Sequence, residues 1–484
     1  MLRSVLSLSV ALALTACSPQ STTPEQQTET AKETVQQQTL SSGIMKENMD
    51  LSVDPGDDFF RYVNGKWFDN FEIPADKSSY GSFVILRDEA QDHVMDIIKS
   101  SAEGDFKAGS DEQKVGDFYR AYMDMENRNA LGTTPLKPEL AKIEAIEDYT
   151  DLAEYFAYAA RYGYGTPFSL TQYPDLKSPK EYLMYTWQSG LGLPEREYYF
   201  KDDEASQTIR DAYVKHIQTM FEIAGFDAPE ASAKMLFDLE TQIAQLHMKK
   251  EQARNFAANY NKLTIDELKA LMPNFAWDAY LAQAEVADIP ALGILQKDYM
   301  QNIDGLIKET ALEDWKTFLK WGLLNASATR LNAELDEANF NFYSKVLRGV
   351  EEQQPQWRRA VSLSNAHVGE LIGKVYVKQH FPPEAKERMM EMVNNLLLAY
   401  KESIENLEWM TDETRAQALD KLSKFTVKIG YPDEWKDYTA LTVNASDLFG
   451  NLKRSSDVNY EEMLKKQGGP VWTHEWGMTP QTVN

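Results

Sequence analysis

Cysteine is almost absent from this chain of 484 residues, since Cys17 is the only one. A single thiol excludes an internal disulfide bond and every zinc site built from several cysteines. Histidine is also scarce, because the chain has 6 of them. Any histidine-rich metal site must therefore be drawn from His93, His216, His247, His367, His380 and His474.

Basic residues are too few to balance the acidic ones. Lys and Arg total 50, Asp and Glu total 75, and the formal net charge is −25. A surface this acidic repels phosphate backbones, so we expect no nucleic-acid partner. Hydrophobic residues still make up 43% of the chain, which provides for a sizeable core and excludes wholesale disorder.

The first 41 residues are predicted to lie outside the folded body. Residues 1–16 have a basic start and an apolar run, as a secretory signal does. The run ends in Leu14-Thr15-Ala16-Cys17, which resembles a bacterial lipobox, so we expect a lipid anchor on Cys17. Ser18 favours the outer membrane of the cell envelope, facing the periplasm. The alternative is an ordinary cleaved signal. The polar segment 17–41 is expected to be a flexible tether.

Helical periodicity dominates beyond residue 42, and strand signals are limited to residues 168–171 and 182–186. Apolar residues three or four positions apart form a stripe on one face of a helix. Two such stripes are Leu236, Leu239, Ile243 and Leu246, and Val393, Leu396, Tyr400, Ile404 and Leu407. The sequence therefore predicts a large protein of the mainly α class.

Three helix starts can be predicted from the residues that precede them. Thr264 and Glu267 have the spacing of a capping box. Pro383 opens the helix that carries the second stripe, and Thr411 precedes two acids in the next helix, where they favour the helix dipole.

No complete catalytic motif is present. An H-E-x-x-H zinc helix needs two histidines one turn apart, whereas His474-Glu475 is followed by Met478 at the second ligand position. His367 and Glu370 have a spacing that suits either a shared metal or a hydrogen-bonded contact. His247 follows a Leu-rich stripe and is expected to pack against or cap a helix. Phosphate-binding loops and G-x-S-x-G elbows are absent as well.

Several segments, taken together and in order, resemble the neprilysin-like zinc metallopeptidases, especially the bacterial oligopeptidase O type. They are DPGDDFFRYVNGKW (54–67), YGSF (80–83), LRDE (86–89), GLPEREYY (192–199), WRR (357–359), EWM (408–410), IGYPD (429–433) and WGMTPQTVN (476–484). Each match is weak alone, but their order along the chain is specific.

The resemblance implies two helical lobes around a central cavity that admits peptides, and a zinc ion that cleaves them. In such enzymes H-E-x-x-H and a third ligand in E-x-x-x-D follow the segment that reaches Asn484 here. The chain is therefore expected to be an N-terminal portion with an incomplete catalytic lobe, to bind no zinc itself and to be inactive alone. We expect residues 42–100 and 406–484 in the catalytic lobe and 101–405 in a helical lid.

The resemblance suggests two substrate-binding residues. Asn484 matches an asparagine that hydrogen-bonds the substrate backbone, and Arg87 matches an arginine near one end of the cleft. It is equally expected that Arg87 instead forms an ion pair with a nearby acid and has only a structural role. Ser79 stands where some members carry a carboxylate-gripping arginine, which favours endopeptidase over dipeptidyl carboxypeptidase action. The alternative function is a non-catalytic peptide-binding or chaperone-like periplasmic lipoprotein of unknown oligomeric state.

Overall fold

The computed structural model describes residues 43–484. The predicted signal (1–16), the predicted lipid anchor at Cys17 and the predicted tether (17–41) lie outside the described residues. The chain divides into two compact units between Glu72 and Ile73, and each is described by itself. Within the described range, no helix combines the length and the apolar character needed to cross a membrane.

The smaller unit contains η1 (Lys46–Asn48) and α1 (Phe59–Asn70). The side chain of Asp58 caps α1 by accepting a hydrogen bond of 2.9 Å from the backbone N–H of Arg61. Gly65 lies against Asp50, because a β-carbon on Gly65 would stand 2.6 Å from the β-carbon of Asp50. The first family-like segment thus forms a capped helix with a glycine at a close contact.

The larger unit is mostly helical, which confirms the mainly α class expected from the sequence. Its helices up to the second third of the chain are α2 (Ser82–Glu103), α3 (Asp111–Met123), α4 (Met125–Leu131), η2 (Thr134–Leu136), α5 (Lys137–Glu144), α6 (Tyr149–Tyr162), α7 (Glu197–Phe200), α8 (Glu204–Ala224), α9 (Pro229–Leu246), α10 (Lys250–Ala253), α11 (Phe256–Asn259), α12 (Ile265–Leu271), α13 (Trp277–Gln283), α14 (Lys297–Glu309) and α15 (Leu312–Ser327). They are followed by η3 (Ala328–Arg330), α16 (Ala333–Phe340), the π-helix η4 (Asn341–Val346), α17 (Gln356–His380), α18 (Pro383–Asn406), α19 (Asp412–Ser423) and α20 (Leu448–Lys466).

The structure confirms the predicted helix starts. The capping box of Thr264 and Glu267 opens α12, with both reciprocal hydrogen bonds present. Pro383 is the first residue of α18, and the side chain of Thr411 caps α19. The first predicted stripe also packs as expected, because Leu236, Leu239 and Ile243 of α9 are buried.

One four-stranded sheet interrupts the helices, in the order β1-β2-β4-β3. The predicted strands appear as β1 (Phe168–Pro174) and β2 (Tyr182–Gln188), which pair antiparallel with Phe168 opposite Gln188. The sequence interpretation missed β3 (Asn261–Thr264) and β4 (Ala291–Ile294). β4 runs parallel to β2 and antiparallel to β3. These two strands have four residues each, too few for a periodic signal.

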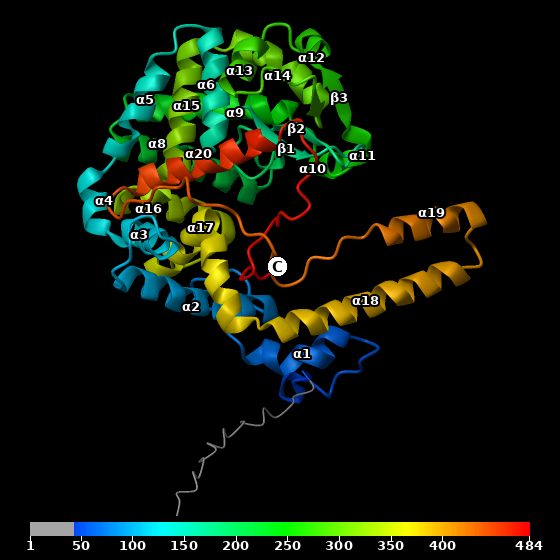
Figure 1. Ribbon diagram of the computed structural model, residues 1–484. Helices are drawn as coiled ribbons and strands as arrows, with labels where there is room; N and C mark the ends of the chain where they lie inside the picture. Colours follow the sequence, from blue (N-terminus) through cyan, green and yellow to red (C-terminus); the bar gives the residue numbers. More distant parts are fainter. Residues whose placement is uncertain (1–42) are drawn as a thin grey trace, which may run out of the picture. The chain divides into compact units, whose positions relative to one another are not determined.

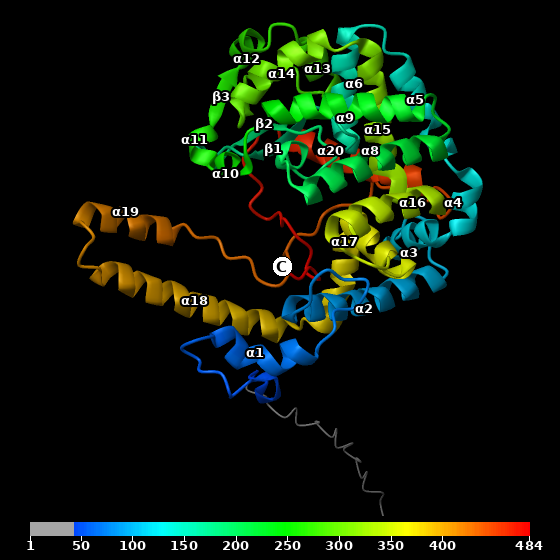
Figure 2. The ribbon, with the colours of Figure 1, turned by 180° about the vertical axis from the view of Figure 1, so that it is seen from behind.

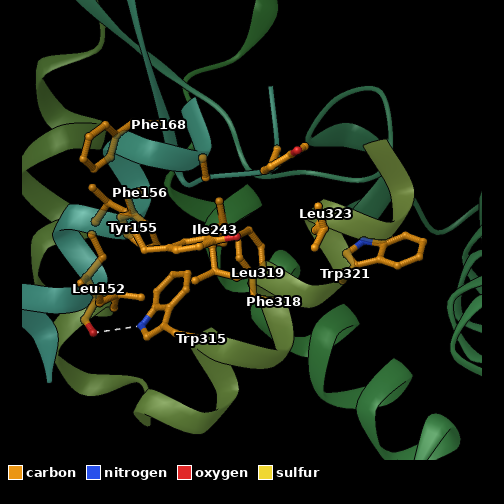
Figure 3. Close-up of a cluster of buried hydrophobic side chains, with 14 of the residues drawn as sticks. Leu152, Tyr155, Phe156, Phe168, Ile243, Trp315, Phe318, Leu319, Trp321 and Leu323 are labelled. Carbon is orange, nitrogen blue, oxygen red and sulfur yellow. Dashed lines mark hydrogen bonds between the residues drawn. The ribbon is translucent and has the colours of Figure 1, made fainter. Parts of the chain in front are cut away.

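The main hydrophobic core joins α5, α6, α8, α9, α15 and the sheet. Figure 3 shows its aromatic centre, where Phe156 meets Trp315 with ring centroids 5.6 Å apart. The indole N–H of Trp315 donates a hydrogen bond of 3.1 Å to the carbonyl of Ile307, so its polar atom is satisfied. Phe168 of β1 and Phe275 also meet edge to face at 5.3 Å. This core holds the sheet against the helices.

A second core joins α2, α3, α17, the start of α20 and the segment from Tyr438 to Val443. Helix α17 is kinked at Val368, whose φ of −131° and ψ of 26° are not helical. Gly116 of α3 lies on the backbone of α2 at Ser101, where a β-carbon would overlap the carbonyl group. Helices α2, α3 and α17 of this core also contribute walls to the cavity described below.

The second predicted stripe forms a helix but does not form a core. Helix α18 has no buried residue, and Leu396 and Tyr400 are 51% and 62% exposed. Helices α18 and α19 contact each other as a hairpin, which extends away from the other helices of this unit (Figures 1 and 2). The expectation that this stripe packs is therefore met only in part: Val393, Ile404 and Leu407 are half-buried, whereas Leu396 and Tyr400 stay exposed.

Candidate functional site

A cavity of about 780 Å³ lies in the larger unit. Its walls come from the segment before α2, from α2 and α3, and from η3, α16, η4 and α17. Charged, amide and hydroxyl side chains dominate the lining: Asp76, Lys77, Ser79, Arg87, Asp88, Gln91, Tyr122, Arg330, Asp336, Asn339, Ser344, Arg348, Glu352, Gln353 and Arg359. A cavity of this size and polarity suits a polar ligand with several hydrogen-bonding groups.

Arg87, predicted as a substrate-binding residue, lines this cavity from α2. Its guanidinium is exposed and has no hydrogen-bond or ion-pair partner among residues 43–484. The nearest carboxylate in sequence, Asp88, is held by Arg358 at 2.6 Å and by Lys77 at 3.1 Å. The ion pair considered for Arg87 is thus absent from the described part of the chain, and its charge faces the cavity.

The cavity is also lined by a buried carboxylate, Asp336 of α16. Asp336 pairs with the guanidinium of Arg359 and accepts a hydrogen bond of 3.1 Å from Gln353. Arg359 also donates to the hydroxyl of Tyr122 at 3.3 Å. Burial raises the pKa of that hydroxyl, so Tyr122 stays protonated and can donate. All oxygens of Asp336 are therefore engaged by the protein itself.

Two further arginines near Tyr122 form no ion pair with a carboxylate in the described part of the chain. Arg128, which is buried, donates to the carbonyls of Leu331, Tyr122 and Thr329, each at 2.9 Å. Arg330 lines the cavity and donates to the carbonyl of Ala326. Burial lowers the pKa of both guanidiniums, while Asp336 partly offsets this.

The wall contributed by η4 has an unusual backbone. Residues Asn341–Val346 form a π-helix, a form often found at functional sites because it re-aims the side chains that follow. Ser344 of this turn lines the cavity, and so does Arg348 just beyond it. The Arg348 guanidinium donates to the Tyr343 carbonyl at 2.9 Å and to the Ser344 hydroxyl at 3.4 Å, and it has no carboxylate partner among the described residues.

Asn484, the second predicted substrate-binding residue, ends a segment that is fastened to the kink of α17. The amide of Gln481 donates to Asn365 at 2.8 Å and to the carbonyl of Gly369 at 2.9 Å. Gly369 has no room for a side chain, since a β-carbon would stand 2.7 Å from Thr479. Asn484 itself is exposed and does not line the cavity of Arg87, so the structure does not bring the two residues into one pocket.

The candidate metal pairs have other partners in the structure. The Nδ1 atom of His367 lies 3.0 Å from the Ser455 hydroxyl, whereas Glu370 accepts from the backbone N–H of Lys436 at 2.7 Å. Burial, helped by Arg330, lowers the pKa of His367 to about 4, so the imidazole is neutral. Glu475 pairs with Lys466 rather than sharing a ligand with its neighbour His474.

Two histidines far apart in the sequence come together unexpectedly. His93 of α2 stacks on His380, the last residue of α17, with ring centroids 4.0 Å apart. Both burial and His93 lower the pKa of His380. No local spacing could have revealed this contact. Even so, residues 43–484 contain no cluster of three or more His, Cys, Asp or Glu side chains that could hold a metal ion.

Comparison with known proteins decides the family. The model of peptidase family M13 matches residues 55–432, which is most of the chain. The chain belongs to peptidase family M13. The neprilysin-like resemblance seen in the sequence is thereby confirmed, and the segments 54–67, 192–199 and 357–359 all fall largely or wholly within the M13 match.

Relatives of this M13 chain include animal and bacterial proteins. Mouse endothelin-converting enzyme-like 1 is 27% identical over 470 residues, covering 91% of this chain and 59% of the relative. Neprilysin-3 of Drosophila melanogaster is 26% identical, covering 92% and 60%. The crystal structure of zinc metalloprotease Zmp1 of Mycobacterium tuberculosis with an inhibitor is 36% identical, with a TM-score of 0.86, covering 92% and 67%. The M13 chain thus spans about three fifths of the length of the curated relatives it matches.

Zinc is the metal implied by the M13 family, and the described residues do not fit it. His367 and Glu370 are directed to different partners, and so are His474 and Glu475. Two cavity-lining arginines that the sequence interpretation missed are Arg330 and Arg348. Neither lies in a motif, and only the fold places them beside Arg87 in the cavity.

Proposed function

We propose that this M13 chain is part of a zinc-dependent metalloendopeptidase that cleaves peptides. The observation that carries the proposal is the match of residues 55–432 to the family, together with 36% identity and a TM-score of 0.86 to a zinc metalloprotease. Similarity of this extent over 92% of the chain supports a shared activity as well as a shared fold.

The cavity supplies chemistry that suits a peptide. The side chains of Gln91, Asn339 and Ser344 line it and carry both donors and acceptors for backbone amides. Its volume of about 780 Å³ falls in the range of small-ligand pockets and accommodates a short extended segment rather than a folded domain. Ser79, which also lines the cavity, has no guanidinium and so cannot itself bind a C-terminal carboxylate as the matching arginine of some family members would.

The proposal assigns the zinc ion to residues outside the range Met1–Asn484. H-E-x-x-H does not occur at any of the six histidines of the chain. When bound, zinc would polarise the scissile carbonyl and lower the pKa of a water molecule. The residues that line the cavity would bind and orient the peptide.

The test begins with the reading frame beyond Asn484. We expect it to encode H-E-x-x-H and E-x-x-x-D, and we expect the complete protein to hydrolyse an internally quenched peptide in a chelator-sensitive way, with one zinc by metal analysis. Residues 18–484 alone should show neither activity nor stoichiometric zinc. A frame without these motifs would overturn the proposal and favour a peptide-binding or chaperone-like lipoprotein. Chelator-sensitive hydrolysis by residues 18–484 would overturn the assignment of the metal.

We also propose that Cys17 carries a lipid that holds the protein on the outer membrane, facing the periplasm. The lipobox-like residues Leu14–Cys17 support this location. Cell fractionation should find the protein with the membranes and the Cys17→Ser variant either unprocessed or released. If the Cys17→Ser variant were processed correctly and still found with the membranes, the protein would have to be held there by a different anchor.

A further inference from the structure

The charge in the cavity is opposite to the charge of the molecule. The whole chain carries a formal net charge of −25. The cavity, in contrast, is lined by five cationic side chains, Lys77, Arg87, Arg330, Arg348 and Arg359, and by four carboxylates, Asp76, Asp88, Asp336 and Glu352. A cationic pocket in an acidic protein is a local arrangement that the overall composition does not explain.

The ion pairs within the cavity leave more unpaired positive charge than the numbers of cationic and anionic side chains suggest. Asp88 is paired with Lys77 and with Arg358, and Asp336 is paired with Arg359. Asp76 lies 3.8 Å from Lys77. Glu352 is the one lining carboxylate without a cation within ion-pair distance in the described chain, and it is exposed. By contrast, three guanidiniums that line the cavity have no carboxylate within that distance among residues 43–484: those of Arg87, Arg330 and Arg348.

Arg330 is the most informative of these three because it is partly buried. Its hydrogen bond to Ala326 engages a neutral carbonyl, and Asp336, the carboxylate that raises its pKa, is already in contact with Arg359. Arg128 adds a second buried positive charge beside Tyr122. A half-buried cation without a counter-ion is costly, and an anion entering the cavity would relieve that cost.

We propose that Arg330 and Arg348 form a carboxylate-binding subsite in the cavity, so that peptides carrying an acidic group there bind in preference to their neutral counterparts. The inference rests on the proposed peptide-binding function of the same cavity. The carboxylate can be an Asp or Glu side chain or the C-terminus of the peptide. The planar fork of a guanidinium matches either group with two parallel hydrogen bonds.

The test is an equilibrium binding measurement on the complete protein, with EDTA present so that binding is separated from cleavage. Four fluorescent peptides of one length would carry a central Glu or Gln and a free or amidated C-terminus. Fluorescence anisotropy at low salt would give each Kd. We expect about tenfold tighter binding when the preferred carboxylate is present, and the four arms show which carboxylate it is.

Arg330→Gln and Arg348→Gln should each remove most of this preference and leave the Kd of the doubly neutral peptide unchanged. Arg348 is exposed, so its variant remains informative if Arg330→Gln fails to fold. Arg388→Gln on α18 changes an exposed arginine outside the cavity and is the matched control, which should behave as the wild type.

Three results would overturn the subsite. One is equal affinity for all four peptides, and the second is a carboxylate preference that survives both cavity variants. The third is loss of the preference in Arg388→Gln as well, which would assign it to overall charge. Failure of every peptide to bind would remove the peptide-binding function too, whereas the first two results leave that function standing.

Discussion

At the scale of single residues, the best-defined polar group in the main core is the carboxyl of Glu240. It accepts hydrogen bonds from the Tyr199 hydroxyl at 2.6 Å, the Tyr213 hydroxyl at 2.9 Å and the backbone N–H of Gly192 at 3.2 Å. Gly192 and Tyr199 open and close the family-like segment 192–199, so this segment folds around Glu240. A side chain on Gly192 would overlap the hydroxyl of Tyr213.

Burial raises the pKa of Glu240 to about 7 although these hydrogen bonds lower it. Because the pKa in the folded state lies above the ordinary value of 4.5, the protonated carboxyl stabilises the fold fully below pH 4.5. This contribution is lost as the pH rises towards 7, at up to about 1.4 kcal/mol per pH unit.

Glu240→Gln should therefore gain stability relative to the wild type as the pH rises. The glutamine stays neutral, so the difference in the free energy of unfolding should shift by roughly 3 kcal/mol in its favour between pH 4.5 and 7. Urea unfolding of both proteins across this range measures the shift, and other titrating groups cancel in the difference. Parallel curves would mean that Glu240 is charged in the folded protein.

The sequence alone predicted the structural roles of some residues and not of others. The placement of His247 as a capping residue was predictable from the stripe before it, and the structure places it at the C-terminus of α9. The partners of His367 and Glu370 were not, because Ser455 and Lys436 are 88 and 66 residues away in sequence. Side-chain chemistry restricts what a residue can do, whereas its partners depend on the fold.

At the scale of elements, long amphipathic helices and their caps were predictable, and local irregularities were not. The helices α12 and α19 begin after capping residues, and α9 and α18 have proline as their first residue. The π-helix η4 and the kink at Val368 have no such signals. Packing against other elements imposes them, as at Gly369, which receives Thr479. Both irregularities matter, because η4 lines the cavity and the kink holds the segment that leads to Asn484.

The crossing of α2 and α3 gives a prediction at this scale. A β-carbon at Gly116 would overlap the Ser101 carbonyl and lie 3.0 Å from the α-carbon of Ala102. Neither backbone can move easily, so Gly116→Ala should destabilise the protein by about 1–3 kcal/mol. Gly305→Ala in α14 meets nothing within 4 Å and should stabilise it by about 0.5–1 kcal/mol.

Both substitutions replace a helical glycine by alanine, so they share the gain in helix propensity and differ in the contact. Denaturant midpoints of the two variants measure that difference. If Gly116→Ala were as stable as Gly305→Ala, α2 and α3 would have to be further apart than the structure places them.

At the scale of the whole molecule, family and fold class were predictable because ordered segments from residue 54 to residue 484 match a known pattern. The cavity was not. Arg87, Arg330 and Arg348 are spread over most of the chain, and a net charge of −25 gives no hint of a cationic pocket. The boundaries 42–100, 101–405 and 406–484 remain predictions.

The α18–α19 hairpin exposes several large apolar side chains. Leu396, Leu398 and Tyr400 are 51%, 64% and 62% exposed, and Trp409 between the helices is 75% exposed. Leu396 and Tyr400 lie one turn apart on the same side of α18, and exposed apolar side chains that lie together mark an interface or a site of aggregation. The chain as described leaves this face uncovered, so residues 18–484 in isolation should self-associate through it.

Replacing Leu396 and Tyr400 by Glu should abolish this self-association, because both residues are exposed and lie one turn apart on α18. Sedimentation velocity of residues 18–484 measures the association state. The thermal midpoint should hardly change, since surface substitutions usually alter stability by less than about 0.5 kcal/mol. Leu239→Glu in α9, where the leucine is 4% exposed, is the matched control and should unfold the chain. If the double variant lost as much stability as the control, the hairpin would have to pack against the body of the same molecule rather than project from it.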